Sequence, residues 1–211
     1  MALVVGSFPR DDPLTVDVAE PFRVGFVTGA TPDKWARVWR ERHPRDPLDL
    51  VPVEQEHQET LLRDGELDMC LVRQPIDPDG LHFIPLYDEV QVAVLGDEHD
   101  ATVVEELTLD DLAGEQLVLP HPSGWTPSVA PQDWPEMSIR DAITVVASGT
   151  GVAIMPMSLA RLYDRKDVTF RPVIDLPPTK VGLAWLADNE DPWVHRFIGI
   201  VRGRTERSSR G

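Results

Sequence analysis

Four residues of the sequence, Thr28 to Thr31, form the turn with the clearest potential for binding chemistry. They follow an apolar run, residues 23–27, that is typical of a buried strand, and they precede Pro32, a residue favoured at the first position of a helix. Backbone N–H groups in the first turn of a helix lack partners within it, and the helix dipole adds roughly half a positive charge there. The turn Thr28, Gly29, Ala30 and Thr31 therefore predicts a site for a small anion, most simply a carboxylate.

Arg73 could add a full charge to that site. It follows the apolar run 69–72, which predicts a neighbouring strand, and a guanidinium group can hold a carboxylate with two parallel hydrogen bonds. The competing hypothesis is that Arg73 forms an ion pair with Asp77, Asp79 or another nearby carboxylate of the chain itself. Both alternatives are compatible with the sequence.

Catalytic patterns are absent from the sequence. No pair of its histidines has the spacing of a zinc protease, and the run 148–151, Ser-Gly-Thr-Gly, lacks the glycine spacing of a nucleophile elbow or a nucleotide loop. We interpret this run as the end of a helix, with backbone contact to a ligand as the alternative. The single cysteine, Cys70, lies in an apolar run and is expected to be a reduced core residue. We therefore expect no enzyme activity, no cofactor and no metal.

Strand and helix patterns alternate along the chain in a way that predicts an α/β fold. Residues 22–72 fit the order strand, helix, strand, helix, strand, and the pattern begins again after residue 96 and changes near residue 165. This predicts a discontinuous first lobe, residues 22–95 and 166–205, and a second lobe, residues 96–165. Residues 1–21 are expected to form a mobile leader and residues 206–211 a flexible tail.

Charge and hydropathy restrict the partners of the chain. Its 211 residues carry a formal net charge of −16, which opposes binding to the phosphates of nucleic acid. The sequence contains neither an apolar run long enough to span a membrane nor the pattern of a signal peptide at its start. We therefore expect a cytoplasmic protein that binds neither a membrane nor DNA directly.

Four segments together resemble the effector-binding domain of LysR-type transcription regulators. They are LLRDGELDMCLVRQP at 61–75, GLHFIPLYDEVQVAVLGDEH at 80–99, LTLDDLAGEQLVLP at 107–120 and VVASGTGVAIMPMSLARL at 145–162. The resemblance implies two Rossmann-like lobes of the type 2 periplasmic-binding-protein-like fold, with a ligand cleft between them. The positions that match the family's effector site are Thr28, Gly29, Ala30, Thr31, Arg73, Gln74, His121, Ser123, Gly124 and Thr150.

The same resemblance implies a role in transcription regulation. The family places a helix-turn-helix domain before this one, whereas 21 residues precede Phe22 here, too few for such a domain. We expect a small-molecule sensing domain without its own DNA-binding module, acting through protein contacts as a homodimer or with a full-length regulator. The alternatives are a free-standing solute-binding protein or a small enzyme that uses the cleft.

Overall fold

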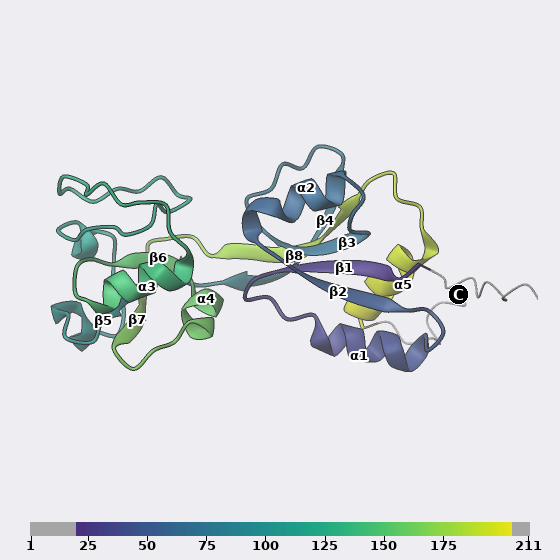
Figure 1. Ribbon diagram of the computed structural model, residues 1–211, viewed down its shortest axis with the longest axis horizontal. Coiled ribbons are helices and arrows are strands. Elements are labelled where there is room, and N and C mark those ends of the chain that lie inside the picture. The colour runs from purple at the N-terminus through teal and green to yellow at the C-terminus, as the bar shows by residue number, and fades with distance from the viewer. Residues whose placement is uncertain (1–19, 204–211) are drawn as a thin grey trace, which may run out of the picture.

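The computed structural model describes residues 20–203, so the predicted tail and all but the last residues of the predicted leader lie outside the described residues. Figure 1 shows two α/β lobes placed end to end, joined where the chain crosses from one lobe to the other and back again. No helix in the described part of the chain is long and apolar enough to cross a membrane.

The first lobe is built on a five-stranded sheet of order β2-β1-β3-β8-β4. Its strands are β1 (Phe22–Val27), β2 (Leu48–Val53), β3 (Met69–Arg73), β4 (Leu81–Glu89) and β8 (Thr179–Leu186). β1 runs parallel to β2 and β3, which suits the order of alternating strands and helices, whereas β8 runs antiparallel to both of its neighbours. The sheet therefore receives β8, between β3 and β4, from a distant part of the sequence.

Helices cover both faces of this sheet. On one face, α1 (Asp33–Arg42) and α5 (Pro192–Val201) pack together, because each carries an apolar stripe at helical spacing. Phe22 stacks on Trp39 with their ring centroids 5.2 Å apart. On the other face, α2 (Gln58–Arg63), preceded by the 3₁₀ turn η1 (Gln55–His57), buries Leu62 against Val53, Cys70 and neighbouring side chains.

The second lobe has a three-stranded antiparallel sheet of order β6-β5-β7. The strands are β5 (Gln91–Gly96), β6 (Ala153–Pro156) and β7 (Val168–Pro172), and the helices are α3 (Ile139–Ala147) and α4 (Met157–Leu162). Two 3₁₀ turns, η2 (Asp100–Val103) and η3 (Asp110–Leu112), precede the long segment 120–137. Just before β6, Val152 forms an isolated parallel bridge with Leu117.

The two crossing points differ from the predicted division of the chain. β4 and β5 are separated by Val90 alone, and β7 and β8 by residues 173–178. Both β5 and β7 pair within the second sheet, although the division at 95/96 and 165/166 assigned them to the first lobe. The reason is that Gly96 and the turn residues visible in the sequence stand at the end of β5, whereas the crossing before β5 is continuous extended chain.

Gly182 in β8 gives a testable consequence of this packing. A Cβ atom there would overlap the carbonyl oxygen of Ile84 and the ring of Phe83 on the adjacent strand. We expect Gly182→Ala to lower the free energy of unfolding by about 1 to 3 kcal/mol, as overpacked cores do. Urea denaturation measures this.

The matched control is Gly199→Ala in α5, where an added Cβ meets no atom within 4 Å. Alanine has the higher helix propensity, so this variant should be more stable by up to about 1 kcal/mol. Equal effects of the two substitutions would contradict the packing described for β8.

Candidate functional site

A cavity of about 590 Å³ lies where the two lobes meet. Its wall is mostly apolar and draws on both lobes and on both crossing segments. The residues that line it are Gln55, Arg73, Gln74, Pro75, Ile76, Gln91, Leu119, Pro120, His121, Pro122, Ser123, Ile139, Ile154, Met155, Pro156, Leu159, Pro177, Pro178, Thr179 and Lys180. A space of this size, with few polar groups on an apolar wall, suits a small organic molecule.

Arg73, the last residue of β3, is the most buried charged side chain in this wall, with 2% of its surface exposed. Its Nε donates to Glu89 Oε2 at 2.7 Å, and its Nη1 donates to Gln55 Oε1 at 3.1 Å. Its Nη2 donates to the carbonyl oxygen of Thr28 at 3.1 Å and to Ser158 Oγ at 3.3 Å. Because Ser158 belongs to α4, the guanidinium group connects the two lobes.

The buried partner of Arg73 is Glu89. Glu89 ends β4 and is 6% exposed, so both charges are almost fully removed from water and balance each other. The sequence left open a pairing with a carboxylate of the chain, and the structure shows that pairing, with Glu89 as the partner. Asp77 lies near Arg63 instead. The charge of Arg73 is therefore not available in full to a ligand.

A second polar group in the wall is centred on Gln91, at the start of β5. Its Nε2 donates to Thr179 Oγ1 at 2.6 Å, and its Oε1 lies 3.3 Å from His121 Nε2. His121 Nδ1 accepts from the backbone N–H of Ser123, which leaves the ring proton on Nε2, facing Gln91. Burial lowers the pKa of His121 below its ordinary value, so the neutral ring is favoured near neutral pH.

The predicted turn 28–31 lies behind this wall rather than in it, since none of its four residues is among those that line the cavity. Thr28 accepts from Arg73, and Gly29 approaches Ser158 and the guanidinium group closely enough that a Cβ would lie 2.8 Å from Ser158 Oγ. The helix begins at Asp33, with Pro32 as its N-cap, one residue later than expected. The carboxylate of Asp33 already supplies negative charge to the first turn of α1.

Other predicted site residues divide between the cavity and its surroundings. Gln74, His121 and Ser123 line it with Arg73, whereas Gly124 lines a neighbouring cavity in the second lobe. Thr150 Oγ1 lies 2.7 Å from Ser148 Oγ just after α3, in agreement with the helix-end interpretation.

Sequence reasoning missed the lining residues that directly follow the two crossings, among them Gln91 at the start of β5 and Thr179 and Lys180 at the start of β8. The signal that could have found them is the proline pair 177–178, which interrupts the pattern between the last strands of the two lobes.

The formal charge of the wall differs in sign from that of the whole chain. Arg73 and Lys180 are the charged residues among the described lining side chains, and none of these is aspartate or glutamate. Lys180 Nζ lies 3.2 Å from Asp88 Oδ1 in an exposed pair, so it remains close to solvent. In a chain of net charge −16, a wall without carboxylates favours a neutral or anionic ligand.

Outside this cavity, the described residues include a buried cysteine thiol and no cluster of possible metal ligands. Burial raises the pKa of Cys70 to about 12, so its thiol stays protonated at neutral pH. Within residues 20–203, no group of three or more His, Cys, Asp or Glu side chains is placed to hold a metal ion.

The sequence matches one protein family over most of its length. The sequence model described as the LysR substrate binding domain matches residues 18–206. The Hca operon transcriptional activator HcaR of Escherichia coli K12 is 29% identical over 199 residues, which cover 86% of this chain and 67% of that protein. The regulator AlsR of Bacillus subtilis 168 is 25% identical over 218 residues, 89% of this chain and 68% of that protein.

Solved structures agree with this match. The BenM effector binding domain, determined with its effector benzoate, superposes with a TM-score of 0.71 at 20% identity, covering 88% of this chain and 92% of that one. A variant of the OxyR regulatory domain from Pseudomonas aeruginosa gives a TM-score of 0.65 at 21% identity, with 88% and 99% covered. These likenesses confirm the predicted two-lobe, periplasmic-binding-protein-like fold.

The Arg73–Glu89 pair can be tested by a double-mutant cycle. Either Arg73→Met or Glu89→Met alone leaves a buried charge unpaired, and we expect each to lower the free energy of unfolding by about 3 to 5 kcal/mol. The double variant should lose clearly less than the sum of the two. Urea denaturation of the four proteins gives the coupling.

The control is Arg165→Met, which removes an ion pair of the same 2.7 Å length between exposed side chains. It should change the stability little, because water screens exposed pairs. Additive losses from the two single variants would show that Arg73 and Glu89 do not depend on each other.

Proposed function

This chain belongs to the LysR substrate-binding domain family and is an effector-binding domain of that type, and we propose that its effector binds in the cavity between the two lobes. One observation carries the proposal, namely an apolar cavity of about 590 Å³ whose charged lining residues are Arg73 and Lys180. The curated relatives HcaR and AlsR are transcription regulators, which supports regulation over catalysis or solute uptake as the role of the cavity.

The effector that fits this wall is a small organic carboxylate with an apolar body. Leu119, Ile139 and Ile154 provide apolar contact, and Gln91, Thr179 and Lys180 provide polar groups along one side. Lys180 supplies the charge, because its pair with Asp88 is exposed and screened by water, whereas the charge of Arg73 is balanced by the buried Glu89. Screening over roughly 8–10 Å leaves the acidic remainder of the chain with little influence on an anion held there.

Binding would act on the arrangement of the lobes. Residues from both lobes contact the same cavity, so a ligand that fills it stabilises the arrangement in which those residues surround it. Arg73 and Gln91 lie at the crossing and bond to groups on either side of it, which makes this region the point where binding alters the contacts between lobes. We place this activity in the cytoplasm, in keeping with relatives that regulate transcription.

The proposed site can be tested with benzoate and benzamide, which share an aromatic body and differ in charge. A ligand at about 100 times its Kd stabilises a protein by about 2.7 kcal/mol, which raises the melting temperature by several degrees. We expect benzoate to bind more tightly than benzamide in thermal-shift titrations of the full chain. The series extends to larger ring carboxylates, each with its amide.

A wedge variant separates this cavity from other sites. The side chain of Gln74 lines the cavity, and a tryptophan in its place would fill the space. Gln74→Trp should abolish the benzoate shift, whereas Lys166→Trp in an exposed turn of the second lobe should leave it unchanged. Binding that survives Gln74→Trp, or amides that bind as well as carboxylates, would refute the proposed site or its charge preference.

We also propose that two copies associate side by side, or that one copy associates with a full-length regulator, through α1 of one and the second lobe of the other. The exposed basic residues of α1, Lys34, Arg37 and Arg40, outnumber its exposed acidic residues, Asp33 and Glu41, so its exposed face carries a small positive charge. The second lobe exposes an acidic segment at 103–106 in which Val103 is 86% exposed. Opposite charges around an exposed apolar side chain support an interface of this orientation.

Sedimentation velocity at tens of micromolar tests the interface. Arg37→Glu places a negative charge opposite the acidic segment, so we expect it to shift the chain from dimer towards monomer. Lys166→Glu makes the same change of charge in an exposed turn and should leave the dimer intact. A monomeric wild-type chain, or equal effects of the two variants, would contradict the proposed interface.

A further inference from the structure

Three glutamine side chains line the cavity between the two lobes, and they differ in how firmly the structure holds them. Gln91 is bonded at both ends of its amide, and the side chain of Gln74 makes no hydrogen bond within residues 20–203. Gln55, the first residue of η1, is bonded at one end only, where its Oε1 accepts from Arg73 Nη1 at 3.1 Å. Gln55 therefore presents one free polar group in a direction that Arg73 sets.

The chemistry of Arg73 determines which end of the Gln55 amide is free. A guanidinium group only donates hydrogen bonds, so the amide oxygen must face Arg73 and the amide nitrogen must point away from it. Arg73 is itself held in place, because its Nε donates to Glu89 Oε2 at 2.7 Å. Gln55 Nε2 thus carries two N–H donors that no described residue accepts.

The free nitrogen of Gln55 is within reach of a ligand. Gln55 is half-buried and lines the cavity. Among the side chains of residues 20–203 that are not exposed, the nitrogen of the Trp134 indole is the one polar atom that is both fully buried and without a partner. Because Gln55 Nε2 also lacks a partner, it keeps accessible surface, and a donor of this kind in a cavity wall suits an acceptor on a bound molecule.

A second free donor lies where the chain enters β8. His121 donates from Nε2 towards Gln91 Oε1, 3.3 Å away, and this turns Gln91 Nε2 towards Thr179 Oγ1 at 2.6 Å. Thr179 Oγ1 accepts that bond, so its own hydroxyl proton can be donated to a ligand. With the ammonium group of Lys180 beside it, this part of the wall suits the carboxylate of the proposed effector.

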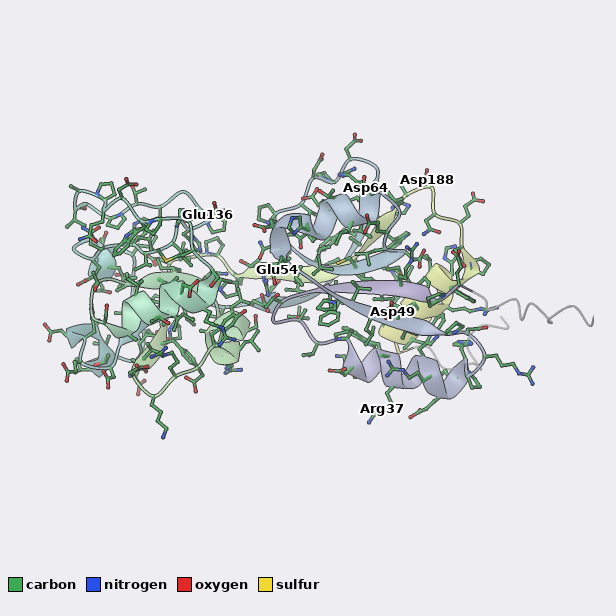
Figure 2. All side chains as sticks on the ribbon, viewed as in Figure 1. Arg37, Asp49, Glu54, Asp64, Glu136 and Asp188 are labelled. Atoms are coloured by element: carbon green, nitrogen blue, oxygen red, sulfur yellow. The ribbon has the colours of Figure 1, made fainter. Side chains whose placement is uncertain are left out.

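Charges around Gln55 favour an uncharged acceptor at its amide. The residues on either side of it in the chain, Glu54 and Glu56, are exposed carboxylates, and Figure 2 shows Glu54 near the junction of the lobes. Arg73, the cation bonded to Gln55, is already balanced by Glu89. A second carboxylate would therefore meet repulsion here, whereas a carbonyl oxygen can accept from Gln55 without that cost.

We propose that Gln55 is a specificity-determining residue of the effector cavity, and that the effector carries, besides its carboxylate, an uncharged acceptor oxygen such as a carbonyl, to which Gln55 Nε2–H donates. This inference rests on the proposed function, because it assumes that the effector binds in this cavity. The bond would also join the ligand to the contacts between the lobes, since Arg73 donates both to Gln55 and to Ser158 of the second lobe.

Two ring carboxylates of similar shape test the donor. para-Acetylbenzoate has a carbonyl oxygen where para-isopropylbenzoate has a methyl group, and the two meta isomers direct the same groups along another line. Titration calorimetry of the full chain gives a Kd for each, and the ratio of the two values in a pair removes the contribution of the shared ring and carboxylate.

Gln55→Glu keeps an oxygen for Arg73 and replaces the free donor by a second oxygen. We expect it to lower the preference for the acetyl over the isopropyl compound by about fivefold in at least one pair, the change expected for one hydrogen bond. Gln55→Asn withdraws the amide without a change of charge and should lower the same ratio. The control Gln132→Glu adds the same charge at an exposed residue of the cavity beneath residues 120–137 and should leave the ratio unchanged.

The side-chain N–H signals of Gln55 report the contact directly. In a chain with ¹⁵N-labelled glutamine they are identified by their loss in Gln55→Glu. The acetyl compound should move them downfield in a saturable way, as a new hydrogen bond does, and its isopropyl partner should not. A role of Gln55 that is only structural would give the same response to both compounds.

The outcomes separate this inference from the proposed function. If none of the ring carboxylates binds, or if Gln74→Trp leaves their binding intact, the effector site is wrong and the role of Gln55 falls with it. If they bind in the cavity and the ratio is the same in wild type, Gln55→Glu and Gln55→Asn, the site stands and the role of Gln55 is refuted. An equal fall in Gln132→Glu would assign the effect to charge and refute it as well.

Discussion

The buried ion pair between Arg73 and Glu89 is the interaction on which the junction of the two lobes depends. Arg73 ends β3, and Glu89 ends β4, after which the chain crosses into the second sheet. The backbone of Arg73 is fixed as well, since Gln58 bonds both its N–H and its carbonyl oxygen. With backbone and side chain held, the guanidinium group can reach Thr28 in one lobe and Ser158 in the other without losing its partner.

Local charge rather than net charge determines what the two cavities can hold. The chain carries a net charge of −16, yet the cavity between the lobes has Arg73 and Lys180 in its wall, whereas the cavity beneath residues 120–137 has Asp133 and Glu136. Charges farther away than roughly 8–10 Å are screened by salt, so the nearest side chains dominate. The side chains that line a cavity therefore bear more on the ligand it suits than the net charge of the chain does.

The sequence was sufficient to predict the features that depend on neighbouring residues. Hydrophobic spacing located β1 and α1, and four segments in order identified the family and its two lobes. Contacts between residues far apart in the chain could not be predicted from the sequence. Arg73 and Ser158, for example, are 85 positions apart, and the ion-pair partner of Arg73 also became known only from the structure. The sequence did not predict that β5 belongs to the second sheet, for the same reason. The strands with which it pairs, β6 and β7, lie more than 50 residues away in the chain.

The separation of the cores explains how such a domain can respond to a ligand. One group of buried residues surrounds Trp39 and Phe197 in the first lobe, and another surrounds Ile143 and Val94 in the second. Each lobe keeps its own core, so a change in their relative orientation disturbs mainly the contacts at the junction. A ligand shifts that orientation only by the difference between its affinities for the two arrangements. Side chains that reach across the junction, as Arg73 does to Ser158 and Gln91 does to Thr179, are therefore the residues through which binding can become a change of shape.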